Sequence, residues 1–256
     1  MKLTIDNREF EAREGQSVFE VAKAGGIPIP SLCYHPAITP YGACRLCLAE
    51  VKQGNRSRIV VSCCYPARDG IRVTTDSEKV VRARRGVMEL LLARAPENEL
   101  LKEMAAAMGV KAGRLPTVTH SQRDCILCGL CVNVCREVIG ASAISFAQRG
   151  VNRVVAPPFL QPSEACIGCG ACAAVCPVGT ITLRWHEDEV EVSPFKSRAK
   201  LQKCEECGAT VGSVALSARV QGKVGEKLGP AARLCDRCKR RRLAHALSKV
   251  ARPVER

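Results

Sequence analysis

Eight cysteines in two runs of identical spacing constrain this chain more than any other feature of its sequence. Each run reads C-x2-C-x2-C-x3-C, and the runs are Cys125, Cys128, Cys131, Cys135 and Cys166, Cys169, Cys172, Cys176. A [4Fe–4S] cluster needs four thiolates at the corners of a tetrahedron, and one tight loop at this spacing can supply three of them. Zinc sites usually combine paired C-x2-C knuckles, and buried apolar cysteines have no reason to repeat in register. The runs therefore predict two [4Fe–4S] clusters.

The fourth cysteine of each run is expected to cross to the other cluster, as it does in two-cluster ferredoxins. One ligand set is then Cys125, Cys128, Cys131 and Cys176, and the other is Cys166, Cys169, Cys172 and Cys135. Pro177 follows the second run, as this motif prefers, whereas Arg136 stands at the equivalent position of the first run. The ligands are intact in both, so residues 120–195 are predicted to form a two-cluster ferredoxin-like domain.

The composition favours metal ligation over disulfides. Only 4% of the 256 residues are aromatic, so small domains in this chain need staples, and 17 cysteines can provide them. The N-terminal sequence MKLTIDNREF has no apolar stretch of signal-peptide length, and no run approaches 18 apolar residues. We therefore expect a protein of the reducing cytoplasm, without a transmembrane segment.

The first 75 residues are predicted to form a sheet, one helix and a long loop. Alternating side chains predict strands at 2–5 and 9–13 around the turn Asp6-Asn7, with further strands at 46–51 and 59–62. Ser17, with Glu20 three residues later, predicts the start of a helix that Gly25-Gly26 ends. The loop and the returning strand carry Cys33, Cys44, Cys47 and Cys63, a set that can enclose a [2Fe–2S] cluster.

The words SLCYHP and GACRLCLAEV, with ten residues between Cys33 and Cys44, resemble the N-terminal domain of the large iron–sulfur subunit of respiratory NADH dehydrogenase. The same domain opens the diaphorase-side subunits of NAD-linked hydrogenases and formate dehydrogenases. The resemblance implies a plant-type [2Fe–2S] domain over residues 1–75, with Cys63 of the word SCCYP as the fourth ligand. Cys64 is then a spare thiol, because neighbours on a strand point to opposite faces.

Residues 76–119 are predicted to form a helical linker, capped by Thr75 or Asp76, broken at Pro96 and ended at Gly109. Relatives of the resembled family usually carry a histidine-ligated cluster here, spaced H-x3-C-x2-C-x5-C. This chain has no cysteine between Cys64 and Cys125, and His120 is interpreted as a loop residue. The relay is thus one cluster shorter, and either packing or another subunit must close the gap.

Residues 196–256 are predicted to form a zinc-ribbon-like segment, preceded by closing strands at 180–184 and 190–192. Its ligands are Cys204 and Cys207, followed by Cys235 and Cys238, with strands expected within 211–220. The quartet favours zinc, and a third [4Fe–4S] cluster is the alternative. A short basic helix is expected at 244–250.

The formal net charge of +14 suggests an acidic partner, and metal loading would lower it to roughly +6. The run Lys239, Arg240, Arg241, Arg242 either docks an acidic neighbour or is a solvated surface.

Three clusters in one chain indicate an electron conduit, because iron–sulfur clusters move single electrons without transforming a substrate. No strand is followed by G-x-G-x-x-G, and no catalytic residue is assigned, so the substrate-reactive centres belong to other subunits. The overall prediction is an α+β electron-transfer subunit of an NAD(P)-linked complex, such as a hydrogenase, a formate dehydrogenase or a bifurcating enzyme. A flavin-containing, NAD(P)H-reactive subunit and a second redox subunit or ferredoxin are the expected partners.

Two other functions compete with this one. The iron–sulfur subunit of a quinone-linked succinate or fumarate enzyme also joins a plant-type domain to a cubane domain, but it uses the shorter C-x4-C-x2-C loop and mixes cluster types. A basic, zinc-containing nucleic-acid-binding or redox-sensing protein would explain only the last fifth of the chain.

Overall fold

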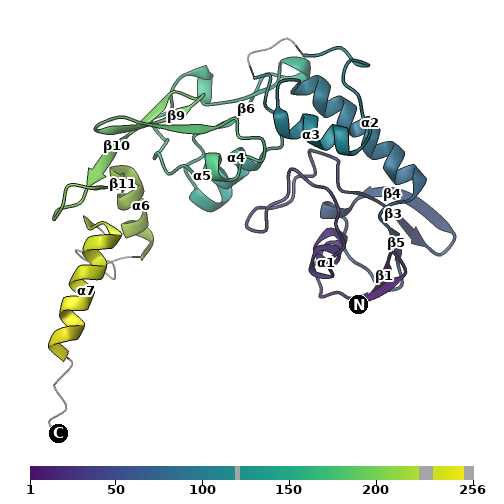
Figure 1. Cartoon of the computed structure of the whole chain (residues 1–256), viewed down its shortest axis with the longest axis horizontal. Coiled ribbons are helices and arrows are strands. Elements are labelled where there is room, and N and C mark those ends of the chain that lie inside the picture. Colours follow the sequence, from purple (N-terminus) through teal and green to yellow (C-terminus); the bar gives the residue numbers. More distant parts are fainter. Residues whose placement is uncertain (119–121, 225–232, 251–256) are drawn as a thin grey trace, which may run out of the picture.

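The computed structural model describes residues 1–118, 122–224 and 233–250, with the side chains of 249 and 250 left out. The molecule is an elongated arch, with an N-terminal sheet at one end and helix α7 projecting from the other (Figure 1). No helix in the described ranges is long and apolar enough to cross a membrane.

The N-terminal part is a five-stranded sheet in the order β2-β1-β5-β3-β4, covered by helix α1. Its elements are β1 (Lys2–Ile5), β2 (Arg8–Glu11), α1 (Val18–Ala24), β3 (Leu48–Gln53), β4 (Arg56–Val61) and β5 (Arg72–Thr74). Strands β1 and β5 run parallel, and the other neighbours run antiparallel. The apolar residues of the alternating strands, including Ile5 and Val51, form one core with Val18 of the helix.

The predicted start of α1 is confirmed. Ser17 Oγ accepts a hydrogen bond from the Glu20 amide at 3.2 Å, and the Glu20 carboxylate accepts one from the Ser17 amide at 2.7 Å. This reciprocal capping box satisfies two amides that the first turn of a helix leaves without partners.

Two helices follow the sheet, α2 (Glu78–Arg94) and α3 (Glu99–Ala107). The expected cap at Thr75 or Asp76 is wrong, because Ser77 accepts the hydrogen bond from the Val80 amide. Thr75 is committed elsewhere, since its hydroxyl and its amide both donate to the Asp6 carboxylate, at 2.6 and 2.7 Å. The break at Pro96 is confirmed.

The central part is built from short elements around the cysteine runs. These are α4 (Leu130–Asn133), the π-helix η2 (Val134–Ile139), β6 (Ser145–Ala147), η3 (Gly150–Asn152), β7 (Val154–Ala156), η4 (Pro158–Leu160) and α5 (Ala171–Ala174). Strands β6 and β7 form an antiparallel hairpin that the sequence did not reveal, because three-residue strands leave little periodicity to detect.

A four-stranded antiparallel sheet in the order β11-β10-β9-β8 closes this part. Its strands are β8 (Thr182–Trp185), β9 (Glu189–Ser193), β10 (Ser197–Lys203) and β11 (Thr210–Ser213). The first two were expected. Strand β10 pairs with β9, so the sheet continues across residue 195, where a domain boundary was expected.

The C-terminal part departs from the expected ribbon. The segment 211–220 is strand only as far as Ser213 and then becomes α6 (Val214–Val224). Ser213 Oγ accepts the Leu216 amide at 3.1 Å and so caps a stretch rich in helix-forming alanine and leucine. Helix α7 (Asp236–Val250) is longer than the helix expected at 244–250 and begins beside Cys235.

Candidate iron–sulfur and metal sites

Four of the five cysteines of the N-terminal part lie together in its interior. Cys33, Cys44, Cys47 and Cys63 are all buried. The Cys44 amide donates to Cys33 Sγ at 3.4 Å, and the Leu32 amide donates to Cys44 Sγ at 3.5 Å. Hydrogen bonds from the thiols of Cys44 and Cys63 lower the pKa of Cys33 to about 3. Backbone amides that point at sulfur favour thiolates and their iron complexes.

Cys63 lies inside this group of buried cysteines, whereas Cys64 lies at the surface. Cys63 is 1% exposed and packs with Phe19 and Cys47, whereas Cys64 is exposed. They lie in a short 3-10 turn, Ser62–Cys64, and not on a strand as expected. The turn still directs only one of the two thiols inward.

The cysteines of the two C-x2-C-x2-C-x3-C runs line two separate cavities. The first cavity, of about 120 Å³, is lined by Cys125, Cys128, Cys131 and Cys176. The second, of about 30 Å³, is lined by Cys135, Cys166, Cys169 and Cys172. The fourth cysteine of each run thus faces the cavity of the other run. Burial raises the pKa of Cys128 and of Cys172 to about 12.

Only glycine fits at position 168, where the sheet packs on the cysteine loop beside the second cavity. Gly168, between Cys166 and Cys169, has a φ of +62°, and a Cβ there would lie 2.7 Å from both Ala199 Cβ and Val190 Cγ1. The sheet formed by β9 and β10 can therefore pack directly on the loop only because residue 168 has no side chain.

The π-helix explains the departure at Arg136. Cys135 lies in η2, and its Sγ accepts a hydrogen bond from the Ala143 amide at 3.3 Å. Arg136 lies inside the same helical segment, where a proline ring would clash with the preceding turn. The first run can therefore keep its ligand without the proline that follows the second run.

The N-terminal loop packs against the first cavity. Leu32, Cys33 and Cys44 of the loop share one hydrophobic core with Ile126 and Cys128. The same core includes residues of α2 and α3, among them Met88, Leu92 and Leu101. The sequence left open whether packing or another subunit shortens the relay. In this structure Cys33 and Cys44 of the first group lie in one packed core with Cys128 of the second.

Polar and aromatic contacts that the sequence did not reveal support this interface. The Thr39 amide donates to Glu137 Oε2 at 3.0 Å, and the rings of Tyr41 and Phe146 stack with centroids 6.1 Å apart. Arg153 lies over the Phe146 ring at 3.9 Å. These residues belong to no motif, so only the tertiary structure identifies them. His120 lies outside the described residues.

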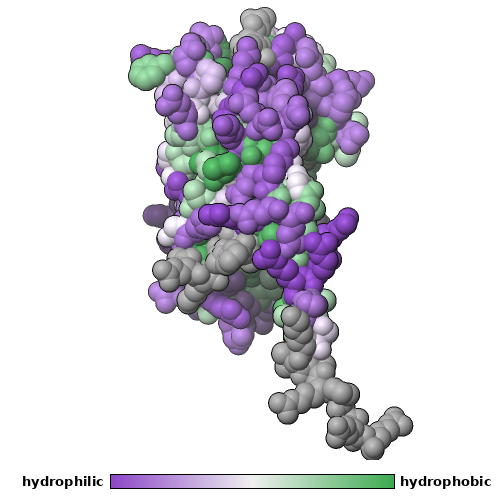
Figure 2. Space-filling view, turned by 90° about the vertical axis from the view of Figure 1, so that its left-hand side faces the viewer, coloured by the Kyte–Doolittle hydropathy of each residue, from purple (hydrophilic) through white to green (hydrophobic). Residues whose placement is uncertain are grey.

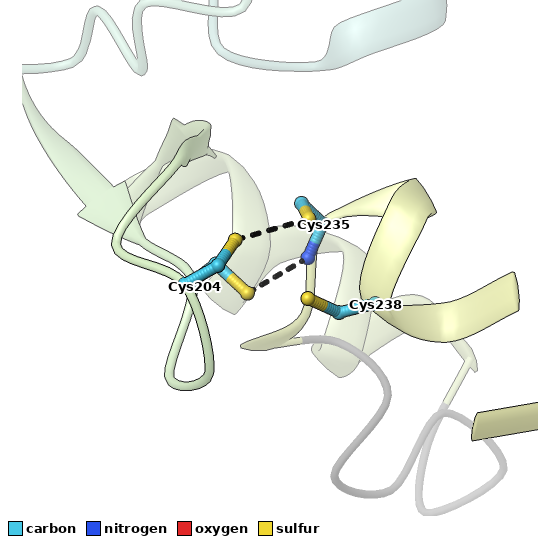
Figure 3. A group of neighbouring side chains, drawn as sticks. Cys204, Cys235 and Cys238 are labelled. Carbon is cyan, nitrogen blue, oxygen red and sulfur yellow. Dashed lines mark hydrogen bonds between the residues drawn. The ribbon is translucent and has the colours of Figure 1, made fainter. Parts of the chain in front are cut away.

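The C-terminal cysteines form a separate group of four. The sulfurs of Cys204, Cys207, Cys235 and Cys238 all lie within 4.8 Å of one another. Figure 3 shows Cys204, Cys235 and Cys238 converging from the end of β10 and the start of α7, with the Cys235 amide donating to Cys204 Sγ at 3.3 Å. Among the described residues, this group alone has the closeness needed to surround a single metal ion.

Family models match three parts of the chain. A model described as a 2Fe-2S iron-sulfur cluster binding domain matches residues 1–78. Models described as 4Fe-4S dicluster domains match residues 119–183 and 165–212. The prediction of one [2Fe–2S] domain followed by a domain for two [4Fe–4S] clusters is confirmed.

Two curated relatives come from bacterial redox complexes. The NADPH-Fe(3+) oxidoreductase subunit alpha of Geobacter sulfurreducens is 32% identical over 222 residues, covering 78% of this chain and 25% of that protein. The NADP-reducing hydrogenase subunit HndD of Solidesulfovibrio fructosivorans is 31% identical over 228 residues, covering 77% of this chain and 39% of that protein. The chain thus spans well under half of either relative.

A solved structure gives a fuller match. One chain of an NAD+-reducing [NiFe]-hydrogenase in the H2-reduced state has a TM-score of 0.61 and 30% sequence identity, covering 70% of this chain and 85% of that chain. The match therefore extends over most of the length of both chains. The chain belongs to the family of iron–sulfur electron-transfer subunits found in NAD(P)-linked hydrogenases and NADH-quinone oxidoreductases.

Proposed function

We propose that the chain relays single electrons in series from a [2Fe–2S] cluster through two [4Fe–4S] clusters. The observation that carries this proposal is the shared core of Leu32, Cys33, Cys44, Ile126 and Cys128. It sets the first cysteine group against the second, and the second and third groups exchange cysteines across two neighbouring cavities. Electron transfer between clusters requires such proximity, so the order of the centres follows from the packing.

We assign the ligands according to the three cysteine groups described above. Cys33, Cys44, Cys47 and Cys63 bind the [2Fe–2S] cluster. Cys125, Cys128, Cys131 and Cys176 bind the first [4Fe–4S] cluster, and Cys166, Cys169, Cys172 and Cys135 bind the second. The domains at 1–75 and 120–195 carry these clusters, and the helices between them form the linker. None of the 17 cysteines forms a disulfide, which supports a reducing location such as the cytoplasm.

The partners we propose are a flavin-containing, NAD(P)H-reactive subunit at the [2Fe–2S] end and a second redox subunit or ferredoxin at the other end. The names of the relatives support this, since they include an NADP-reducing hydrogenase and an NADPH-Fe(3+) oxidoreductase. We assign no catalytic role to any of the described residues and place the substrate-reactive centres on these partners. A quinone-linked succinate-type complex and a nucleic-acid-binding role have no comparable support.

Iron counting tests this function. Protein purified without oxygen should contain about ten iron atoms per chain, for one [2Fe–2S] and two [4Fe–4S] clusters. Reduction with dithionite should give EPR signals of both cluster types. Two or fewer iron atoms per chain, or an EPR-silent reduced protein, would exclude the relay.

For the C-terminal quartet we propose one zinc ion in preference to a third [4Fe–4S] cluster. Four thiolates on one Zn²⁺, with Zn–S bonds of about 2.3 Å, lie about 3.8 Å apart. Cys207 Sγ and Cys235 Sγ are 3.6 Å apart, and all four sulfurs fall within 4.8 Å. A cubane binds each thiolate to a different iron and so needs wider spacing. These distances fit tetrahedral coordination by two knuckles, one of which opens a helix.

Metal analysis distinguishes the two alternatives. We expect about one zinc per chain, released by a thiol-reactive mercurial and reported by a zinc-sensitive dye, with iron near ten. About fourteen iron atoms and no zinc would assign the quartet to a third cubane.

A further inference from the structure

Among the described residues, helix α7 contacts the rest of the molecule through one face. Cys238 is fully buried in its first turn, next to Leu234. One turn further on, Arg241 Nη2 and Arg242 Nε both donate to the carboxylate of Glu206, the former at 2.6 Å. Because Glu206 lies between Cys204 and Cys207, the metal site and this ion pair hold the same side of the helix.

The opposite face of α7 is apolar and exposed. At 3.6 residues per turn, Leu243 and Leu247 lie about 140° and 180° around the helix from Cys238, and Arg240 lies about 160° away in the other direction. Both leucines are 60% exposed. An amphipathic helix normally turns such residues toward its own core. Here they point away from the only described attachment of the helix.

The charge of α7 indicates the chemistry that this face would meet. Between Asp236 and Ser248 the helix has five lysine and arginine residues against one aspartate. The side of the molecule on which α7 lies is covered mainly by hydrophilic residues, with smaller hydrophobic patches among them (Figure 2). A helix with leucines one turn apart and basic neighbours fits an apolar groove with an acidic rim.

We infer that the α7 docking face, defined as Arg240, Leu243 and Leu247, binds an acidic, apolar-floored groove on the second redox subunit, an inference that rests on the proposed relay function. This is the partner proposed for the end of the molecule from which α7 projects (Figure 1). The metal site sets the direction in which the helix projects. A protein groove accounts for both the charge and the leucines, whereas a nucleic acid would use only the charge. Membrane-surface helices add aromatic anchors, and residues 236–250 contain none.

The test uses the full chain, purified anaerobically with its partner subunits. The double substitution Leu243→Glu/Leu247→Glu should weaken binding of the chain to the second redox subunit, measured by biolayer interferometry, by at least about tenfold. Arg240→Glu should also weaken it, and the wild-type dissociation constant should rise with salt. Val151→Glu is the matched control, because Val151 is 70% exposed on a distant turn, and it should bind like the wild type.

The iron and zinc contents show whether a variant is folded. The iron content of the wild type shows whether the proposed relay exists, independently of what α7 binds. Each variant should keep the iron and zinc contents of the wild type. If the double leucine variant loses either metal, its binding result is discarded and the binding of Arg240→Glu decides whether the inference holds. If wild-type protein lacks iron, the relay function fails whatever α7 binds. If iron is present and the double variant binds the subunits normally, the inference is wrong. It is equally wrong if the substitutions abolish binding to phosphatidylserine-containing vesicles or duplex DNA but leave subunit binding unchanged.

Discussion

At the scale of single residues, Gly168 shows how tightly the sheet packs against the cysteine loop beside the second cavity. Its position between two cysteines leaves no room for a Cβ, because Val190 and Ala199 of the covering sheet approach to 2.7 Å. Both atoms belong to short side chains on paired strands, which cannot swing aside. A single methyl group would therefore have to separate the sheet from the cysteine loop.

Gly168→Ala should lower the iron content by up to about four atoms per chain and speed bleaching of the protein in air. The expected cause is displacement of Cys166 and Cys169, not the cost of the positive φ itself. Gly150→Ala separates the two effects, since Gly150 has a φ of +59° and no atom within 4 Å of the point where an alanine methyl would lie. Equal iron loss in the two variants would show that backbone strain, and not the contact, is responsible.

The exchange of the fourth cysteine also belongs at this scale. Cys135→Ser/Cys166→Ser removes two residues that line the second cavity. We expect this variant to lose one cluster and keep about six iron atoms. Cys125→Ser/Cys135→Ser removes one residue from each cavity, and it should lose both cubanes and keep about two iron atoms. If each cluster took all four ligands from its own run, the two iron contents would be reversed.

At the scale of elements, α2 and α3 connect the N-terminal sheet to the part of the chain that carries the two cysteine runs. In this chain the helices contribute apolar side chains, with Met88 and Leu101 fully buried beside the loop that carries Cys33. The linker thus stabilises the contact between two cysteine groups by packing. Burial of these apolar side chains is the expected source of the linker's stability.

Leu101→Ala should reduce the free energy of unfolding by about 2–5 kcal/mol, because it leaves a cavity in this core. Its neighbour Leu100 is 37% exposed on the same helix, so Leu100→Ala should cost less than about 1 kcal/mol. Anaerobic urea unfolding followed by circular dichroism measures both values. Similar losses would mean that α3 is not packed as described.

At the scale of the whole molecule, the arch places the N-terminal sheet, the short helices α4 and α5 of the two cysteine runs, and helix α7 in succession (Figure 1). The first two cysteine groups share a core, and the second and third share their cysteines across two cavities. The [2Fe–2S] cluster should therefore sense the first cubane far more strongly than the second.

EPR relaxation of the reduced [2Fe–2S] cluster tests this order. Cys125→Ser/Cys131→Ser removes two residues lining the first cavity, and the relaxation of the [2Fe–2S] signal should slow because its paramagnetic neighbour is lost. Cys169→Ser/Cys172→Ser removes the equivalent pair from the second cavity and should leave that relaxation unchanged. A stronger effect of the second pair would reverse the proposed order.

Local features of the chain could be predicted because their physics is local. The spacing of the cysteines determines which cluster a loop can hold, and the family models confirm one [2Fe–2S] and two [4Fe–4S] domains. Ser17 and Glu20 formed the expected capping box for the same reason. Predictions failed where a residue had a distant competing partner, as when Asp6 engaged Thr75 and left the cap to Ser77.

The amino-acid sequence by itself determined the kinds of cofactor, the order of the cysteine groups along the chain and the departure from relatives between Cys64 and Cys125. Only the tertiary structure decided that the N-terminal loop packs on the first cavity, that Gly168 lies under the sheet and that α7 turns its leucines outward. These features depend on contacts between residues far apart in the chain. Such contacts leave no periodicity or spacing in the sequence, because they are selected by the joint packing of several elements.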